Sequence, residues 1–217
     1  MSSSLQDKYL SVRKSIPAHV TLVAVSKFHP VEAIKEVYDA GQRVFGENRV
    51  QELMQKQPLL PADMQWHVIG TLQTNKVKYI APFVSLIHSV DSPKLLTEID
   101  KQAKKCNRVI DCLLEIFIAK EETKHGLSFE EAEAIFNSPP LPNVCIKGVM
   151  GMATNTSNEQ QVREEFKSLA TFYNKHKSAH NLLYMSMGMS SDYQLAIEEG
   201  SNVVRIGSSI FGISPRK

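Results

Sequence analysis

The chain has 217 residues, of which 42% are hydrophobic and 22% charged, and its 25 basic and 23 acidic residues leave a net charge of +2. This composition excludes a disordered or low-complexity chain, because there is enough apolar material for a large core. The small basic excess argues against a nucleic-acid-binding protein, in which basic residues are more numerous or more clustered. The densest basic cluster, from Lys101 to Arg108, is interpreted as the solvated end of a helix.

Cysteine usage and the N-terminal segment restrict the compartment. Three cysteines without a CxxC pair argue against a disulfide framework or a zinc site, so no metal is expected. Cys112 and Cys145 lie in apolar runs and are expected to be buried. The first eight residues contain no apolar signal segment, and no run approaches the ~18 apolar residues of a membrane-spanning helix. We therefore expect a cytoplasmic protein without membrane or nucleic-acid partners.

Apolar, β-branched runs of strand length alternate with amphipathic runs of helical length along the chain. A first helix is predicted up to about Ser15. Strands are predicted at Thr21–Lys27, Val44–Asn48, Trp66–Gly70, Leu86–Asp91, Asp111–Ile118, Cys145–Ala153, Leu182–Gly188 and Val203–Gly207. Most of these runs are nearly continuous in apolar residues, which is typical of strands covered by helices on both faces.

Capping signals predict where the intervening helices begin and end. Gly41 and Gly200 are expected to end two of them. Ser92 followed by proline predicts an N-cap, and the segments beginning at Ser128 and Ser157 fit the capping-box pattern. Eight strands alternating with helices predict a single α/β domain over residues 1–217, a (β/α)₈ TIM barrel with an extra N-terminal helix. A doubly wound sheet is the alternative that composition does not exclude.

Common catalytic motifs are absent from the chain. There is no GxGxxG, GxxxxGK[ST] or GxSxG segment, which removes the motif-based case for a dinucleotide-binding, nucleotide-hydrolysing or serine hydrolase protein. His176 and His180 have the i, i+4 spacing of zinc ligands, but the segment lacks the glutamate of a zinc protease. The two are interpreted as solvated histidines on a lysine-rich helix.

Polar residues at the predicted strand ends are the remaining candidates, because the C-terminal ends of parallel barrel strands carry the site. Lys27 follows a nearly continuous apolar run. It is either an ordinary strand-end lysine or an amine at the mouth of an apolar site, where burial disfavours the ammonium form and leaves a nucleophile. The segments Gly188–Ser190 and Gly207–Ser209 each place glycine and serine past a strand, as ordinary turns or as a phosphate site. Together these features suggest a phosphorylated carbonyl compound, and pyridoxal 5′-phosphate (PLP) has both groups.

At these residues the sequence resembles the pyridoxal phosphate homeostasis protein family, whose barrel is similar to the N-terminal domain of bacterial alanine racemase. The resemblance implies a TIM barrel of PLP fold type III. The matching stretches run in family order over nearly the whole chain: Leu22–Lys27, Phe45–Asn48 with Gln51 and Glu52, Trp66–Lys76, Ser89–Asp91, Lys124–Gly126, Gly148–Met150, Ser186–Asp192 and Val204–Gly212.

The resemblance implies roles for individual residues. Lys27 is expected to hold PLP covalently as a Schiff base, and Arg205 to face the pyridine nitrogen. Because an arginine stays charged and only donates, it keeps that nitrogen unprotonated and weakens the ring as an electron sink. The other expected cofactor-binding residues are Ser190, Gly207 and Ser208 at the phosphate, Asn48 close to the cofactor, and Ile69 and Met187 near the ring. The match assigns no role to Lys76 or Lys124, and His67 is interpreted as a hydrogen-bonded core histidine.

The sequence favours a binding protein over an enzyme, so no catalytic residue is predicted. Racemisation needs an acid/base group on each face of the cofactor. In alanine racemase the second is a tyrosine from an additional domain of the partner subunit, whereas five residues follow Gly212 here and all six tyrosines fall in predicted helices or strands. The expected function is intracellular PLP homeostasis by a monomer, with delivery to PLP-dependent apo-enzymes as candidate partners. A single-domain amino-acid racemase is the alternative, and the resemblance disfavours an aldolase using Lys27 without PLP.

Overall fold

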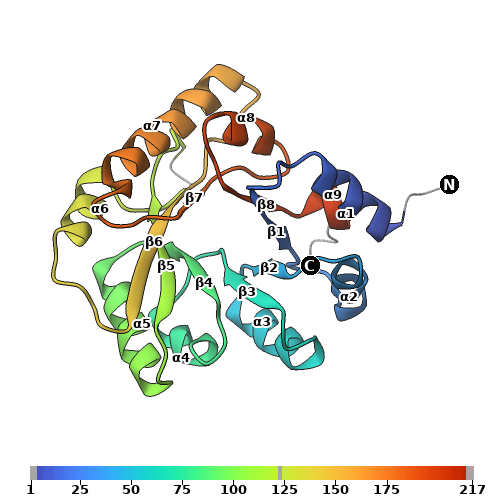
Figure 1. Ribbon diagram of the computed structural model, residues 1–217, viewed down its shortest axis with the longest axis horizontal. Coiled ribbons are helices and arrows are strands. Elements are labelled where there is room, and N and C mark those ends of the chain that lie inside the picture. Colours follow the sequence, from blue (N-terminus) through green and yellow to red (C-terminus); the bar gives the residue numbers. More distant parts are fainter. Residues whose placement is uncertain (1–3, 122–123, 214–217) are drawn as a thin grey trace.

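The computed structural model describes residues 4–121 and 124–213. Among these residues, parallel strands close into a barrel in the order β1 to β8, with β8 pairing back onto β1 (Figure 1). The strands are β1 Thr21–Val25, β2 Val44–Glu47, β3 Gln65–Val68, β4 Leu86–Val90, β5 Ile110–Ile116, β6 Val144–Gly151, β7 Tyr184–Ser186 and β8 Val203–Ile206.

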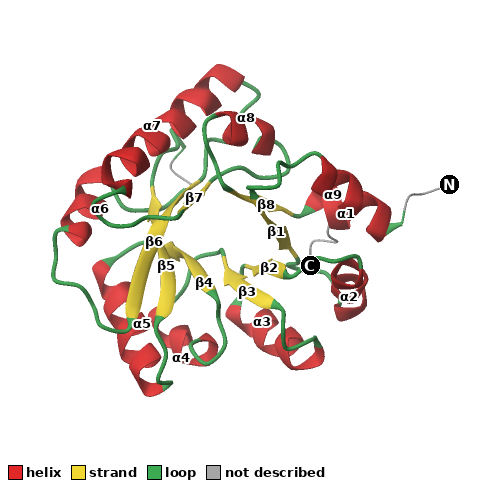
Figure 2. Ribbon diagram, in the orientation of Figure 1, coloured by secondary structure: helices red, strands yellow, loops and turns green. Residues whose placement is uncertain are grey.

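Helices surround the strands on the outside of the barrel (Figure 2). They are α1 Leu5–Lys14, α2 Val31–Asp39, α3 Val50–Lys56, α4 Val77–Ile80, α5 Pro93–Lys105, α6 Phe129–Phe136, α7 Glu159–Lys177, α8 Tyr193–Glu198 and α9 Ser208–Phe211, with short 3-10 turns at η1 Gln57–Leu59 and η2 Thr74–Lys76. The extra helix α1 packs against α2 and α9. The described helices include none with the length and apolar character needed to cross a bilayer.

The predicted (β/α)₈ barrel and its N-terminal helix are confirmed, and the closed order of strands excludes the doubly wound sheet. Each predicted strand overlaps an observed one, but every observed strand ends one or two residues before its predicted end. The run predicted to reach Lys27 leaves the sheet after Val25, and the one predicted at Leu182–Gly188 keeps only three paired residues. The polar ends of these runs therefore form loops at the mouth of the barrel.

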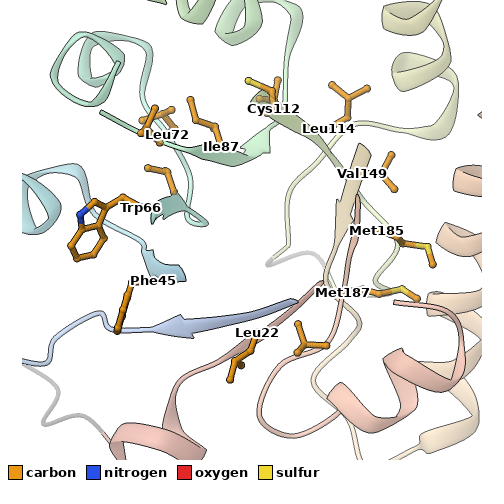
Figure 3. Close-up of a cluster of buried hydrophobic side chains, with 14 of the residues drawn as sticks. Leu22, Phe45, Trp66, Leu72, Ile87, Cys112, Leu114, Val149, Met185 and Met187 are labelled. Carbon is orange, nitrogen blue, oxygen red and sulfur yellow. The ribbon is translucent and has the colours of Figure 1, made fainter. Parts of the chain in front are cut away.

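Side chains of the strands alternate between two layers, as the period of two requires. The outer layer is apolar and packs under the helices; it includes Leu22, Phe45, Trp66, Ile87, Cys112, Leu114, Val149 and Met185 (Figure 3). The inner layer holds a small apolar cluster of Leu86, Leu113 and Met150. Two residues after Leu86 and Leu113, the strands place His88 and Glu115 on the same inner face. Buried polar side chains therefore lie inside the barrel: His88, Glu115, Ser186 and Arg205.

The helix caps agree with the sequence except at one position. Ser92 accepts a hydrogen bond from the amide of Leu95, and Ser128 forms a complete capping box with Glu131. The capping box predicted at Ser157 is wrong: Asn158 is the N-cap of α7 and accepts from the amide of Gln161. Asparagine caps a helix as well as serine does, so the helix begins one residue later. Gly41 and Gly200, with φ of +108° and +97°, follow the ends of α2 and α8 as expected.

Two predictions about buried and exposed side chains need correction. His176 is not solvated: it is 6% exposed and stacks on Phe136, because it lies on the apolar face of α7 that packs on α6. His180 is half-buried against the same ring. Cys112 is buried as predicted, but Cys145 is only half-buried, since the first half of β6 is incompletely covered. All three cysteines are free thiols.

Candidate functional site

The C-terminal ends of the strands open onto a cleft of about 1250 Å³. Seven of the eight residues predicted for cofactor binding line it, and they come from the loops after β1, β2, β3, β7 and β8 and from β8 itself: Lys27, Asn48, Ile69, Ser190, Arg205, Gly207 and Ser208. Met187 is the exception. Its side chain is fully buried in the outer layer beside Met185, away from the cleft (Figure 3).

Lys27 lies two residues past the end of β1, with a half-buried side chain. The residue before it, Ser26, is fully buried, so the backbone leaves the core at Lys27. Among the described residues, none forms a hydrogen bond or ion pair with the Lys27 ammonium group within the usual distances. The amine is therefore available to a ligand in the cleft.

The loops after β7 and β8 meet in the part of the cleft beside the end of β1. The amide of Gly207 donates to the hydroxyl of Ser190 at 3.3 Å, and Ser208 follows directly with an exposed side chain. A Cβ atom added at Gly207 would lie 3.2 Å from the carbonyl oxygen of Val25, so the loop passes close to the end of β1. These hydroxyl and amide donors form the kind of glycine-lined concavity that holds an anion.

The guanidinium of Arg205 is fixed by the barrel interior. The residue is 4% exposed, and its Nη1 and Nη2 atoms donate to the carbonyl oxygens of Ser186 at 2.9 Å and Gly151 at 3.2 Å. A further bond from Nη1 reaches the hydroxyl of Ser186 at 2.5 Å. Burial lowers the pKa of Arg205 to about 10, so the group remains a cation at neutral pH. The cleft therefore contains a rigid, positively charged donor.

A chain of buried hydrogen bonds continues from Arg205 across the barrel. His88 Nδ1 lies 3.0 Å from the Ser186 hydroxyl, and His88 Nε2 lies 2.9 Å from His67 Nδ1. Since Arg205 only donates, every group is satisfied when Ser186 donates to His88 and His88 donates to His67. Burial lowers the pKa of His67 to about 3 and that of His88 well below its ordinary value, so both rings are neutral. The interpretation of His67 as a hydrogen-bonded core histidine is confirmed.

Glu115 is a further buried ionisable group inside the barrel and is 6% exposed. Burial raises its pKa to about 7, although the positive charge of Arg205 opposes that shift. Sequence reasoning missed Glu115, His88 and Ser186. Each of the three is a polar residue within an otherwise apolar strand. Each also lies an even number of positions from a residue of the same strand that faces the barrel interior, which places its side chain on that face.

Asn48 supplies the clearest sign that the cleft accepts a polar ligand. Its Oδ1 atom is buried and has no hydrogen-bond partner among the described residues. A Cβ atom added at Gly70 would lie 2.9 Å from the Asn48 Cβ atom, so glycine at that position lets the asparagine reach its place. Buried polar atoms in proteins are normally paired, and a ligand in the cleft would complete this one.

Lys76 and Lys124, which sequence reasoning left without a role, differ in position. Lys124 lines the cleft and forms an ion pair with Glu121 at 3.1 Å. Lys76 does not line it, and its ammonium group lies 5.9 Å from the centre of the Tyr79 ring. Much of the remaining lining comes from the loop after β6, which includes Thr154 and Asn155, and from α7 and α8. No tyrosine is among the described residues that line the cleft.

A smaller groove of about 520 Å³ lies outside the barrel, between α5, α6 and β6. Apolar side chains dominate its lining, which includes Leu96, Ile135 and Ile146, and it contains none of the predicted site residues. Across residues 4–121 and 124–213, no three histidine, cysteine, aspartate or glutamate side chains are placed to hold a metal ion together. The cleft at the strand ends is therefore the site that gathers the chemistry.

Known proteins are similar to this chain over most of its length. A family model described as alanine racemase, N-terminal domain, matches residues 2–215. A protein of Aquifex aeolicus named pyridoxal phosphate homeostasis protein is 44% identical over 195 residues, which are 88% of this chain and 86% of the relative. A protein of the same name from Schizosaccharomyces pombe is 38% identical over 202 residues, or 91% and 85% of the two chains. The structure of PipY from Synechococcus elongatus with PLP bound superposes with a TM-score of 0.87 at 36% identity, covering 96% of this chain and 100% of that one.

Proposed function

The chain belongs to the pyridoxal phosphate homeostasis protein family, within the wider family of alanine racemase N-terminal domains, and we propose that it binds PLP in the cleft of its barrel for PLP homeostasis. The observation that carries the proposal is the meeting in one cleft of an available amine, a fixed cation and a glycine-lined hydroxyl cluster. These belong to Lys27, to Arg205, and to Ser190 with Gly207 and Ser208. The orphan carboxamide oxygen of Asn48 in the same cleft supports the fit.

Lys27 is proposed to hold the cofactor covalently. PLP supplies an aldehyde, and condensation with the ε-amine releases one water molecule and is reversed by hydrolysis. Ser190, Ser208 and the amide of Gly207 would bind the phosphate, while Arg205 would face the ring nitrogen from its anchored position. Ile69 is half-buried at the cleft and suits an edge of the ring. A place for Met187 near the ring stays a prediction, and its buried position in the outer layer does not support it.

The proposed role is binding rather than catalysis. A cationic donor at the ring nitrogen opposes the protonation that a strong electron sink requires. The described lining of the cleft also offers no tyrosine as a second base. The relatives' name supports the same reading, since it describes homeostasis. A cleft of about 1250 Å³ would leave the adduct accessible to water, which releases the cofactor by hydrolysis.

Several finer parts of the proposal stay predictions. These are delivery to PLP-dependent apo-enzymes, a monomeric state, and a single domain over residues 1–217. A cytoplasmic location is proposed as well, and three free thiols suit a reducing compartment.

The test is chemical trapping of the Lys27 adduct. Protein loaded with PLP should show a visible Schiff-base band, and borohydride reduction followed by peptide mass analysis should place the phosphopyridoxyl group on Lys27. Lys27→Ala should fold normally and lose the band, because a half-buried strand-end side chain leaves no core cavity. Lys76→Ala is the matched control and should keep it. A label found only on Lys76, Lys124 or surface lysines would refute the assignment.

A further inference from the structure

A buried ion cluster holds the backbone next to Lys27. We call it the Lys56 cluster: Lys56 and Glu52 on α3, and Glu47 at the end of β2. The Lys56 ammonium group lies 2.7 Å from Glu47 Oε1 and 2.6 Å from Glu52 Oε1, and it donates a third hydrogen bond to the carbonyl of Ser26 at 2.8 Å. An ammonium group has three hydrogens, so all of its donors are used.

The cluster contacts the residues on both sides of Lys27. Before it, the hydroxyl of Ser26 donates to Glu47 Oε1 at 2.7 Å, in addition to the bond that its carbonyl accepts from Lys56. After it, the amide of Phe28 donates to Glu52 Oε1 at 2.5 Å. The backbone of Lys27 is therefore held at each end by side chains from the β2–α3 segment.

Phe28 has an unusual backbone conformation at this point. Its φ is +66°, in the left-handed region that residues other than glycine rarely adopt. Such a conformation persists only where the surrounding structure holds it, and it is most often found at functional sites. Here the hydrogen bond from the Phe28 amide to Glu52 provides the hold. The direction in which the chain leaves Lys27 thus depends on a side chain of α3.

Stability alone does not explain the cluster. The side chains of Glu47 and Lys56 are 0% and 7% exposed, and a buried ion pair is often no more stabilising than well-packed apolar residues. Glu47 Oε2 has no hydrogen-bond partner among the described residues, and burial raises the pKa of Glu47 against the attraction of Lys56. The hydrogen bonds of the cluster instead converge on the two neighbours of Lys27.

We propose that Lys56, Glu47 and Glu52 are positioning residues for Lys27, which fix the point and direction from which its amine enters the cleft. The inference rests on the proposed function, since that function gives Lys27 its reactive amine. The proposal gives Glu47 and Glu52, which lie in the stretches that match the family, the role of holding the backbone beside Lys27. A displacement of about 1 Å at a reacting group can lower a rate by about 100-fold, so a loosened Lys27 backbone should react more slowly.

The test measures how fast Lys27 of the full-length apo-protein reacts with PLP. Samples are quenched with borohydride over time, and peptide mass analysis compares Lys27 with Lys35, whose side chain is 58% exposed. Glu52→Leu removes the acceptor of the Phe28 amide and should slow Lys27 by about 10- to 100-fold without changing Lys35. Glu52→Gln keeps an oxygen at that position and should restore the rate to within about threefold of wild type.

Two controls separate positioning from general destabilisation. Glu133→Leu removes the same charge from α6, where Glu133 forms an exposed ion pair with Lys175 of α7. Ile99→Ala opens a cavity in α5, at a fully buried residue outside the cleft, and lowers the thermal midpoint without touching the cluster. Both variants should label Lys27 within about twofold of the wild-type rate, when compared at temperatures where all proteins are folded. Ser26→Ala removes the hydroxyl that donates to Glu47 and, at 3.4 Å, to the carbonyl of Gly46, and keeps the carbonyl that accepts from Lys56. It is a milder second variant and should slow Lys27 several-fold.

The outcomes distinguish this inference from the function on which it rests. If wild-type Lys27 is not labelled, the proposed covalent site itself is wrong. If wild-type Lys27 is labelled but Glu52→Leu and Ser26→Ala react at the wild-type rate, the positioning role is overturned. It is also overturned if Ile99→Ala slows Lys27 as much as Glu52→Leu does. Selective slowing that Glu52→Gln restores establishes it.

Discussion

Arg205 and Ser186 are joined by two hydrogen bonds inside the barrel, in which Nη1 of the arginine donates to the serine carbonyl at 2.9 Å and to its hydroxyl at 2.5 Å. The carbonyl bond fixes the guanidinium whatever the residue type at position 186. The hydroxyl bond extends the contact to His88 and His67. The bond to the carbonyl therefore anchors Arg205, and the bond to the hydroxyl links Arg205 to His88 and His67.

We predict that Ser186→Ala lowers the free energy of unfolding by about 1–3 kcal/mol, because it leaves the buried Nδ1 atom of His88 without its donor. Arg205 keeps two carbonyl acceptors, so PLP loading should fall less than stability does. Denaturant unfolding and titration of the visible band measure the two effects. Ser209→Ala, at an exposed serine of α9, should stay within about 0.5 kcal/mol of wild type.

A double-mutant cycle tests whether Ser186 and His88 act together. His88→Leu removes the group that Ser186→Ala leaves unpaired, so the double variant should be less destabilised than the sum of the single variants. The expected coupling is about 0.5–3 kcal/mol, the range for side chains in direct contact. Strict additivity would show that the contact between the hydroxyl and the imidazole contributes nothing to stability.

The second prediction concerns Glu115 and pH. Its pKa is raised from 4.5 to about 7 in the folded protein, so the native state holds more protons than the unfolded state between these values. The free energy of unfolding therefore falls as pH rises from 4.5 to 7, by up to about 3 kcal/mol from this one group. Glu115→Gln removes the titration, and its stability relative to wild type should increase by about that amount between pH 4.5 and pH 8.

His67 acts in the opposite direction in the same experiment. Its pKa falls from 6.5 to about 3 on folding, so its contribution to stability is lost as pH drops below 6.5. Wild type and Glu115→Gln both lose this stability at low pH, so the contribution of His67 cancels in the difference between their free energies of unfolding. Urea unfolding at half-unit pH intervals provides the data. A difference that is flat from pH 4.5 to pH 8 would contradict the raised pKa of Glu115.

The barrel and most of its cleft followed from the sequence because two physical rules are independent of side-chain detail. Continuous apolar runs separated by amphipathic ones predict a parallel α/β fold, either a barrel or a doubly wound sheet, and parallel strands bring their polar ends to one edge. The family resemblance favoured the barrel. Lys27 could be placed at that edge from its position after a strand, and Arg205 from the family resemblance. Met187 could not be placed, because in a continuous apolar run the sequence does not show which of two successive side chains faces the barrel interior. The pairing of Ser186 with Arg205 sets that parity and turns Met187 outward.

The supporting groups were missed for a different reason. Glu52 and Lys56 lie on a helix after β2, and nothing in their spacing shows that they reach across to Ser26 and Phe28. The positive φ of Phe28 accompanies that contact, and phenylalanine as a residue type gives no sign of it. Tertiary hydrogen bonds of this kind override local propensity, so only the structure reveals them.

The third prediction compares two changes in the proposed phosphate loop. A Cβ atom at Gly207 would lie 3.2 Å from the Cβ and carbonyl oxygen of Val25, so Gly207→Val should push this loop and the end of β1 apart. Ser208→Ala removes one exposed hydroxyl and keeps the backbone amide. Loss of that hydroxyl should cost about 1–3 kcal/mol of binding free energy, the contribution of one hydrogen bond to a charged group. Gly207→Val should therefore weaken PLP binding more, in a titration in phosphate-free buffer. Equal affinities for both variants and wild type would place the phosphate elsewhere.

The last prediction is that the loaded protein does not racemise or transaminate amino acids at enzymatic rates. An amino acid's amine can still displace Lys27, since that exchange needs only the carbonyl carbon and the two amines. Removal of the Cα proton should stall, because Arg205 weakens the electron sink and the described lining offers no tyrosine as a second base. Losing one general base lowers a rate by about 10²–10⁴-fold. Incubation with L-alanine in deuterated water should change the spectrum without deuterium at Cα. Incorporation at ~1–10³ per second with formation of D-alanine would instead make the chain a racemase.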